Sequence, residues 1–528
     1  MTALHDVAIV GGRVIDPETS MDAVRNVGVS DGKIVAITTD EIGGKTTIDA
    51  NGLVVAPGFI DTHFHPAGNP WAAKVALRNG VTTVLDTEFG AINVGKWYDE
   101  RIGELPVNFG VTASHEMHRM RVLDQMDIAE AADANNLSEL RAKSYDENAI
   151  PDWAETIISP EQLVDVLSGL DQELAAGAIG IGSTVGYMPM VTTFELFEVQ
   201  KVAANYGRLF ANHVRFLGQS KPPTEGVLGV LEQIANGVAL NQPILISHNH
   251  SYGWWEIEDR LARLRDLGFN AWSEYYPYAA GSTTIGSDFL KPENIAKLGM
   301  DYTNLLNPMT GEYMDRDEYD QIVAEDPGAI VVGFVPGREE WIPLWLQVPH
   351  MTAASDAMPS FDADGNLLGR DDTFEAYSGH PRTAGTQAKV LRLAREHDVP
   401  LLHAIAQLSY WSALHLGDAG MESMRTRGRL QVGMTADITV FDPETVTDNA
   451  SYALGENGLP STGIPHVIVN GVVAVSDSEV LDGNPGQPIR YPTEATGRFE
   501  PPSREDYVNR LFGRELLDSH DHGLDHAH

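Results

Sequence analysis

Histidines and an aspartate recur in this 528-residue chain in a pattern that suits metal binding. His63 and His65 form a His-x-His pair, His213 and His248 each follow a short apolar run, and Asp356 ends another. In an extended chain alternate side chains point to the same side, so the two imidazoles of the pair face one space. Neutral imidazoles and carboxylates are preferred ligands of zinc and similar ions. The pattern therefore predicts a centre for one or two divalent ions, with zinc as the first choice.

The elements that must position this centre are repeated strand–helix units. Eight short apolar runs, most of them followed by a helical pattern, lie at 58–61, 81–85, 107–113, 179–184, 209–212, 243–247, 269–274 and 351–355. Repeated βα units favour a parallel sheet, and eight of them favour a closed (β/α)8 barrel of the TIM type. Catalytic groups in such barrels gather at the C-terminal ends of the strands. The histidines and Asp356 follow strands one, five, six and eight, as a barrel site requires.

Both ends of the chain are β-rich, whereas the middle alternates strands with helices. Short alternating strands with tight turn signals fill 1–57 and return in 426–485. We predict one small β-sandwich domain from these two segments, with a distorted barrel at 58–425 inserted between them. An insert at about 286–349 is too long for a simple loop. The final segment, 486–528, is predicted to be a peripheral C-terminal tail.

Composition excludes several classes of protein. The chain has 36 basic and 75 acidic side chains, a net charge of −39, which argues against nucleic-acid binding and against docking on anionic membranes. It has no cysteine, so no thiolate is available as nucleophile or metal ligand. No signal peptide and no apolar run of about 18 residues is apparent. We expect a cytoplasmic protein with a small-molecule substrate and neither nucleic-acid nor membrane partners; a homo-oligomer is compatible with the sequence.

Several motifs resemble those of a known family. The segment at 54–65 reads VVAPGFIDTHFH and resembles the opening signature of the amidohydrolase superfamily, as does GMTAD at 433–437. Further motifs resemble the N-acyl-D-amino-acid deacylase (D-aminoacylase) branch of that superfamily. They are GSTVGY at 182–187, YPYAAGST at 276–283, SD at 355–356 and HPRTAGT at 380–386. The resemblance extends from about residue 5 to residue 485.

The resemblance implies a role for each matched residue. His63 and His65 would hold one metal ion with Asp356, while His213 and His248 would hold the other. Asp356 would act as general base toward a metal-bound water and then protonate the leaving nitrogen. Such an ion lowers the pKa of its water toward roughly 7 and polarises the scissile carbonyl. The implied activity is metal-dependent hydrolysis of a C–N amide bond.

One departure from the branch concerns a metal ligand. The branch uses a cysteine at the end of strand two, where this chain has Phe89 with Glu88 beside it. A carboxylate can bridge two metal ions, and Glu88 is our choice for that role. Glu116 after strand three is the first competitor and Asp86 is the second. Strand four contains no lysine, which excludes a carboxylated lysine as the bridge.

A second departure concerns the substrate pocket. The branch has lysine where this chain has His250, and an imidazole is a weaker, pH-dependent partner for a substrate carboxylate. Arg382 could hold a carboxylate by two parallel hydrogen bonds, or could form an ion pair within the barrel. Tyr187, Tyr276 and Ser282 match substrate-pocket positions of the family, although each could instead be a packed residue.

These observations lead to one preferred function and two alternatives. The preferred function is deacylation of an N-acyl-(D-)amino acid or a related small amide, with Asp356 as general base and acid. The first alternative keeps the metal site but hydrolyses a cyclic amide or imide, as hydantoinases and dihydroorotases do. The second is a non-catalytic scaffold, whose expected mark is the loss of metal ligands. The sequence retains His63, His65, His213, His248 and Asp356.

Overall fold

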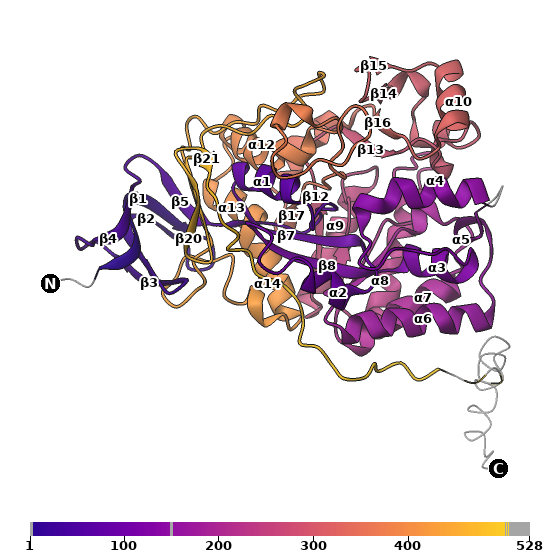
Figure 1. The fold of residues 1–528 in the computed structure, drawn as a ribbon, viewed down its shortest axis with the longest axis horizontal. Helices are drawn as coiled ribbons and strands as arrows, with labels where there is room; N and C mark the ends of the chain where they lie inside the picture. The colour runs from indigo at the N-terminus through magenta and orange to yellow at the C-terminus, as the bar shows by residue number, and fades with distance from the viewer. Residues whose placement is uncertain (1–3, 148–150, 502, 504, 506–528) are drawn as a thin grey trace, which may run out of the picture.

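A computed structural model describes residues 4–147, 151–501, 503 and 505 (Figure 1). Eight parallel strands form its central sheet, and their spatial order follows the order of the sequence. They are β6 (Phe59–Asp61), β7 (Val81–Ala91), β8 (Asn108–Ser114), β9 (Gly180–Ser183), β10 (Leu209–Asn212), β11 (Ile244–Ile246), β12 (Ala271–Tyr275) and β17 (Met351–Ala353). A parallel bridge between Phe64 and Ala357 joins the first and last strands, so the sheet is a nearly closed barrel. The fold predicted from the repeated units is confirmed.

The strands and helices of the barrel follow from their side-chain patterns. β7 is buried along its whole length, as expected for a parallel strand covered on both faces. Helix α6 (Pro160–Ala175) begins at Ser159, which forms a capping box with Gln162, and its buried leucines and valine recur every three or four residues. The longer barrel helices are α1 (Pro70–Arg78), α3 (His115–Leu123), α6, α7 (Thr193–Asn205), α8 (Glu225–Leu240), α9 (Trp254–Asp266), α12 (Arg382–Glu396) and α14 (Trp411–Asp418).

Further helices connect these units: α2 (Val94–Asp99), α4 (Leu137–Glu147), α5 (Asp152–Glu155), α11 (Ile342–Trp345) and α13 (Leu401–Ile405). An apolar core holds the barrel helices to the strands. One apolar cluster packs Ile60, Leu85, Leu245 and Trp272 of the strands against Leu416 of α14. Among the described helices, none is long and apolar enough to cross a bilayer.

The two chain ends pair in a second, nine-stranded sheet. It contains β1 (His5–Asp16), β2 (Met21–Ser30), β3 (Lys33–Thr38), β4 (Gly44–Asp49), β5 (Val54–Pro57), β18 (Ile438–Phe441), β19 (His466–Val469), β20 (Val472–Ser476) and β21 (Glu479–Val480). Antiparallel pairing of β5 with β18 joins the two ends of the chain. The register of β1 shifts between Ile9 and Gly12, so the same edge of β1 pairs first with β4 and then with β5.

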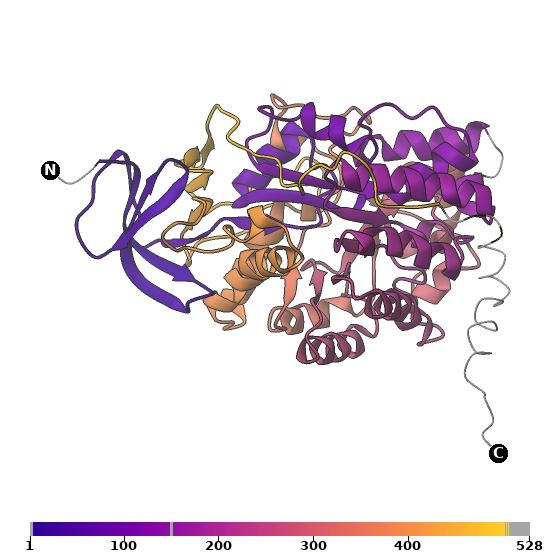
Figure 2. The ribbon, with the colours of Figure 1, turned by 90° about the horizontal axis from the view of Figure 1, so that it is seen from below.

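This sheet lies at one end of the molecule and packs on its own apolar cluster. Figures 1 and 2 both show the indigo N-terminal strands at the outer end of the molecule and the yellow C-terminal strands beside them, next to the barrel. Its core contains Val14, Val27, Val55, Ile438 and Ile468. The strands are hydrogen-bonded in one continuous sheet, and the extra β domain that the sequence predicted from the two chain ends is present. The domain boundaries stay predictions, and the histidines at 519–528 lie outside the described residues.

A four-stranded antiparallel sheet separates β12 from β17. It consists of β13 (Ala280–Thr284), β14 (Leu305–Asn307), β15 (Glu312–Tyr313) and β16 (Ile330–Phe334), with α10 (Arg316–Glu325) between β15 and β16. The sheet begins at Ala280, before residue 286, because β13 pairs with β16 along its whole length. We call 280–345 the insert. Figure 1 shows its sheet and α10 grouped at one corner of the molecule, above α4.

Candidate metal centre and substrate pocket

Six side chains with metal-ligating atoms converge at the carboxyl ends of five barrel strands. His63 and His65 follow β6, Glu88 lies in β7, His213 follows β10, His248 follows β11 and Asp356 follows β17. Parallel strands that close into a barrel bring these ends to one face. Four of the side chains are buried, and His65 and His213 are nearly so. The cluster contains every residue that the sequence analysis named as a metal ligand.

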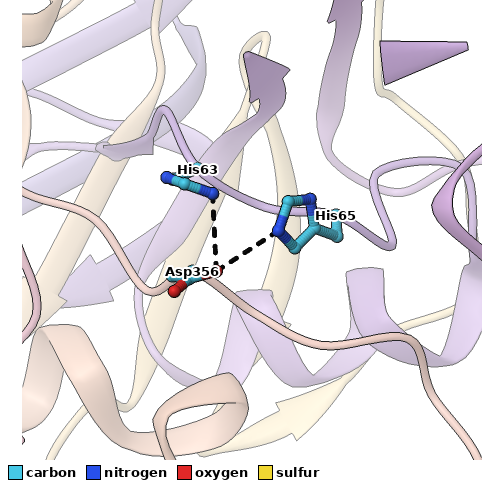
Figure 3. Close-up of side chains that lie close together, drawn as sticks. All are labelled: His63, His65 and Asp356. Carbon is cyan, nitrogen blue, oxygen red and sulfur yellow. Dashed lines mark ion pairs between the residues drawn. The ribbon is translucent and has the colours of Figure 1, made fainter. Parts of the chain in front are cut away.

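Asp356 lies between the two imidazoles of the His-x-His pair (Figure 3). Its Oδ1 atom is 3.4 Å from Nε2 of His63 and 3.2 Å from Nε2 of His65. The ligand atoms of the three residues all lie within 4.8 Å of one another. Two nitrogens and one oxygen at this spacing can hold one divalent ion.

The carboxylate of Glu88 faces the remaining imidazoles. Its Oε1 atom is 3.2 Å from Nδ1 of His248 and 3.7 Å from Nδ1 of His213. Its Oε2 atom points the other way and is 3.4 Å from Nε2 of His63. One carboxylate oxygen is therefore directed toward each pair of histidines, the arrangement that a ligand bridging two ions needs.

A bulge in β7 presents Glu88 to the cluster. The register between β7 and β8 is interrupted between Asp86 and Ala91. The carboxylate of Asp86 accepts hydrogen bonds from the backbone N–H groups of Glu88, Phe89 and Gly90, at 3.2, 3.0 and 3.1 Å. Gly90 has a φ of +82°. These bonds hold the extra residues of the bulge, which re-aims a side chain toward the site.

The two competing carboxylates occupy other positions. Glu116 accepts hydrogen bonds from Nε and Nη2 of Arg141 at 2.8 and 2.9 Å, and another from Thr184. Asp86 holds the bulge and lies 3.3 Å from Nδ1 of His65. Both carboxylates are therefore already partnered, and the structure brings Glu88 rather than Glu116 among the imidazoles.

Sequence reasoning missed Glu274, which orients His63. Nδ1 of His63 donates to Oε1 of Glu274 at 2.5 Å, and the Thr62 hydroxyl donates to the other carboxylate oxygen at 2.8 Å. A carboxylate on the far nitrogen sets the tautomer of a metal-binding histidine and leaves Nε2 free for the ion. The signal in the sequence that could have identified Glu274 is its position as an acidic residue inside the buried strand β12.

The charges of the cluster are strongly interdependent. Burial alone would raise the pKa of Glu88, but His248, His63 and His213 lower it well below its usual range. Burial would likewise raise the pKa of Asp356, and Arg382, His63 and His248 outweigh it. The pKa of His65 rises to about 9, because Asp86 and Asp356 outweigh its burial.

Several buried ligand atoms lack a hydrogen-bond partner among the described residues. They are Nε2 of His63, Oε1 of Glu88 and Nδ1 of His248. Unpartnered buried polar atoms are costly unless a ligand satisfies them. A divalent cation satisfies imidazole nitrogens and carboxylate oxygens together. The donor set therefore fits a metal ion.

Two residues of the cluster have left-handed backbone. His248 has a φ of +51° and Asp356 a φ of +50°. Non-glycine residues rarely adopt this conformation, and such strain often accompanies functional sites. Arg382 fixes Asp356 in place, because its Nε donates to the Asp356 carbonyl at 2.6 Å and its Nη2 lies 2.8 Å from Oδ2.

A cavity of about 150 Å³ opens onto the cluster. His250, Tyr187, Tyr276 and Ser282 line it, as the sequence analysis expected of substrate-pocket residues. Arg382 does not belong to the lining and lies behind Asp356, where the ion pair described above engages it. Its predicted contact with a substrate carboxylate therefore has no support in the lining of this cavity.

The lining residues are held by aromatic and polar contacts. The centroids of the Tyr187 and His213 rings are 4.7 Å apart, and the Tyr187 hydroxyl oxygen is 2.9 Å from that of Thr283. The centroids of the His250 and Tyr276 rings are 4.1 Å apart. Burial, more than the neighbouring Arg338, lowers the pKa of His250 well below its usual range. His250 thus adds little positive charge to the pocket.

Comparisons with known proteins give the class of this chain. No protein-family model matches the sequence. The chain is 28% identical over 487 residues to a D-aminoacylase of Alcaligenes xylosoxydans xylosoxydans, a match covering 88% of this chain and 93% of that protein. Deacylase relatives of the chain indicate a metal-dependent hydrolase that acts on C–N bonds other than peptide bonds. Curated relatives and structural neighbours place the chain in the D-aminoacylase branch of the amidohydrolase superfamily.

Solved structures share the fold. N-acyl-D-glutamate deacylase from Bordetella bronchiseptica, complexed with zinc and a phosphonate inhibitor, has a TM-score of 0.70 at 24% identity, and the match covers 93% of this chain and 100% of that one. L-hydantoinase from Arthrobacter aurescens has a TM-score of 0.59 at 17% identity, over 92% of this chain and 100% of that one. The structural likeness is therefore greater to the deacylase than to this cyclic-amide hydrolase.

Proposed function

We propose that this chain deacylates N-acyl-D-amino acids with the help of one or two zinc ions. The observation that carries the proposal is the position of Glu88, with one carboxylate oxygen toward His63 and the other toward His248 and His213. A relative that is 28% identical over most of both chains is a D-aminoacylase. The carboxylate replaces the thiolate that the branch uses at this place.

The ligands divide into two sets. His63, His65 and Asp356 would hold one ion, while His213, His248 and Glu88 would hold the other, with Glu88 between them. A divalent ion bound there supplies Lewis acidity, which lowers the pKa of water toward roughly 7 and polarises an amide carbonyl. Glu274 keeps the Nε2 atom of His63 directed at the site.

Asp356 moves the proton of the reaction. Its carboxylate takes a proton from the attacking water as the water oxygen bonds to the amide carbon. It then gives the proton to the amide nitrogen as the C–N bond breaks, so the products are an amine and a carboxylic acid, which loses the second proton of the water to the solvent at neutral pH. Arg382 keeps Asp356 ionised before the attack, because the guanidinium beside it stabilises the negative form.

The walls of the cavity favour an apolar group on the substrate. The lining of the cavity includes five apolar residues of the insert, namely Phe289, Leu290, Leu298, Met300 and Leu305. Apolar walls with few polar groups favour binding of alkyl or aryl surface. We therefore propose that the acyl group or the amino-acid side chain is apolar. A cytoplasmic location and the lack of nucleic-acid and membrane partners stay predictions.

The decisive test is hydrolysis of a panel of substrates by the zinc-loaded protein. N-acetyl-D- and N-acetyl-L-amino acids are followed by release of the amine, and two cyclic amides, hydantoin and dihydrouracil, by formation of the ring-opened N-carbamoyl acid, because ring opening frees no amine. We expect turnover confined to the D-enantiomers. Turnover of the cyclic amides alone would replace the proposal by the hydantoinase-like alternative. Protein shown to contain zinc that hydrolyses none of the panel would overturn the deacylase proposal.

A further inference from the structure

Arg338 is a buried arginine that extends from the insert into the cavity. It follows β16 and begins the short helix η6 (Arg338–Trp341). Its residue surface is 5% exposed, and it belongs to the cavity lining. Its Nη2 donates to the Ser251 hydroxyl at 3.3 Å, and the guanidinium also interacts with the Tyr276 side chain; Nε and Nη1 are buried without a hydrogen-bond partner among the described residues.

The charge of Arg338 is not neutralised in the part of the chain that the structure describes. No carboxylate there lies within 4.0 Å of its guanidinium. The other two arginines of the site differ, because Arg141 pairs with Glu116 and Arg382 pairs with Asp356. A buried cation without a counter-ion is costly, so its retention at a cavity wall points to an anion that arrives with a ligand.

The surroundings of Arg338 place this anion site close to the metal centre. Ser251, its hydrogen-bond partner, directly follows His250, and His250 packs on Tyr276. The guanidinium of Arg382 lies 4.5 Å from the centroid of the Tyr276 ring. The same guanidinium forms the ion pair with Asp356. The cavity that Arg338 lines is the one that Asp356, Glu88 and His248 also line. A ligand in it can reach both the ions and the guanidinium.

An N-acyl amino acid carries an amide and a carboxylate on one carbon. We propose that Arg338 binds the α-carboxylate of the substrate and selects acids over neutral amides; this inference rests on the proposed deacylation. The free N–H groups of Arg338 donate to the carboxylate oxygens, and Ser251 holds the guanidinium in position. Arginine suits this role because its guanidinium stays charged and its donors have a fixed geometry. The insert therefore supplies a permanent cation to the wall of this cavity.

The test compares each acid with its neutral amide. N-acetyl-leucine and N-acetyl-leucinamide are assayed in both enantiomers with the zinc-loaded wild type, Arg338→Met, Arg338→Lys and Arg316→Met. Arg316 is an exposed arginine of the insert that pairs with Asp320 on the surface, so its variant is a matched control for loss of one charge.

We expect Arg338→Met to lower kcat/KM for the acid about 10- to 100-fold, mostly through KM, and to leave the value for the amide unchanged. Arg338→Lys should recover part of the loss, because an ammonium retains the charge without the planar geometry. Arg316→Met should resemble the wild type. An equal loss for acid and amide, or no loss for the acid, would overturn the inference.

A binding measurement separates this inference from the deacylase proposal. N-methylsulfonyl-leucine has no scissile carbonyl, so its affinity for the zinc-loaded protein is measurable by calorimetry without turnover. We expect Arg338→Lys and Arg338→Met to weaken its binding, with no change for its carboxamide. A wild type that releases no amine from any acid would refute the deacylase proposal alone. Equal affinity in wild type and in both variants would refute the role of Arg338 alone.

Discussion

The barrel end and the insert both line one cavity, but with different kinds of side chain. The barrel end contributes four histidines and two carboxylates, brought together from five strands. The insert contributes mostly apolar side chains and one guanidinium, that of Arg338. The barrel strands pack into the main core, whereas the insert sheet has its own apolar cluster around Leu305 and Val331. The comparison teaches that the strand ends hold the chemistry and that a separately packed segment determines what reaches it.

The largest effect is expected at the barrel end. Asp356→Asn should lower turnover about 10²- to 10⁴-fold, because the amide cannot accept the proton of the attacking water. Most of the bound metal and the melting temperature should persist, since the histidines and the barrel core are unchanged. Steady-state rates, elemental analysis and thermal melting check this. Full activity in a variant that contains metal would refute the role of Asp356.

The second prediction distinguishes Glu88 from Glu116, its first competitor for the place of the cysteine of the branch. Glu88→Gln should weaken metal binding at least about 10- to 100-fold, the range typical of removing even an outer partner of a metal ligand. Glu116→Gln is the control: it should lower the melting temperature, because Arg141 loses its buried partner, but it should retain the metal. Metal content by elemental analysis distinguishes them, and loss of metal only in Glu116→Gln would reverse the choice.

The third effect concerns the apolar wall. Leu298 is a half-buried residue of the insert that lines the cavity, and Leu298→Asp places a charge there. We expect kcat/KM for N-hexanoyl substrates to fall about tenfold relative to N-acetyl ones, since a longer chain meets the charged wall. The control is Leu344→Asp, at an exposed position of α11. An unchanged ratio would show that the insert wall does not contact the acyl group.

The fourth effect is on stability rather than on activity, and it lies where the barrel and the insert join. The Lys389 ammonium of α12 is 3.7 Å from the centroid of the Tyr278 ring, which precedes β13. Burial, partly offset by Asp448, lowers the pKa of Lys389 from 10.5 to about 8. The unfolded chain therefore binds more protons between these values, so the contribution of Lys389 to the free energy of unfolding rises as the pH rises from 8 to 10.5.

Removing the ammonium should remove this pH dependence. Relative to Lys389→Met, the wild type should gain of order 1–3 kcal/mol of stability between pH 8 and 10, as a shift of this size implies. Denaturant unfolding of both proteins across that range measures the difference. A constant difference would mean that the ammonium at this junction is better solvated than its surroundings indicate.

Much of the site could be predicted from the sequence because its cause is local. The alternation of an extended chain aligns His63 with His65, and the repeated βα pattern places His213, His248 and Asp356 at strand ends. The superfamily resemblance and the barrel were predicted from the same residues and are confirmed. These inferences needed only the spacing of residue types along the chain.

Only the tertiary structure decided which charges meet. His63 and Glu274 are 211 residues apart, and Glu116 of α3 proves to be the partner of Arg141 of α4, with Thr184 donating to the same carboxylate. Nothing in the spacing of the sequence reports that Arg338 is buried without a carboxylate. Local patterns determine which way a side chain points, whereas charge compensation in a buried site depends on contacts between distant segments. The chain by itself therefore specified the chemistry, and the packing of the insert on the barrel decided the shape and charge of the pocket.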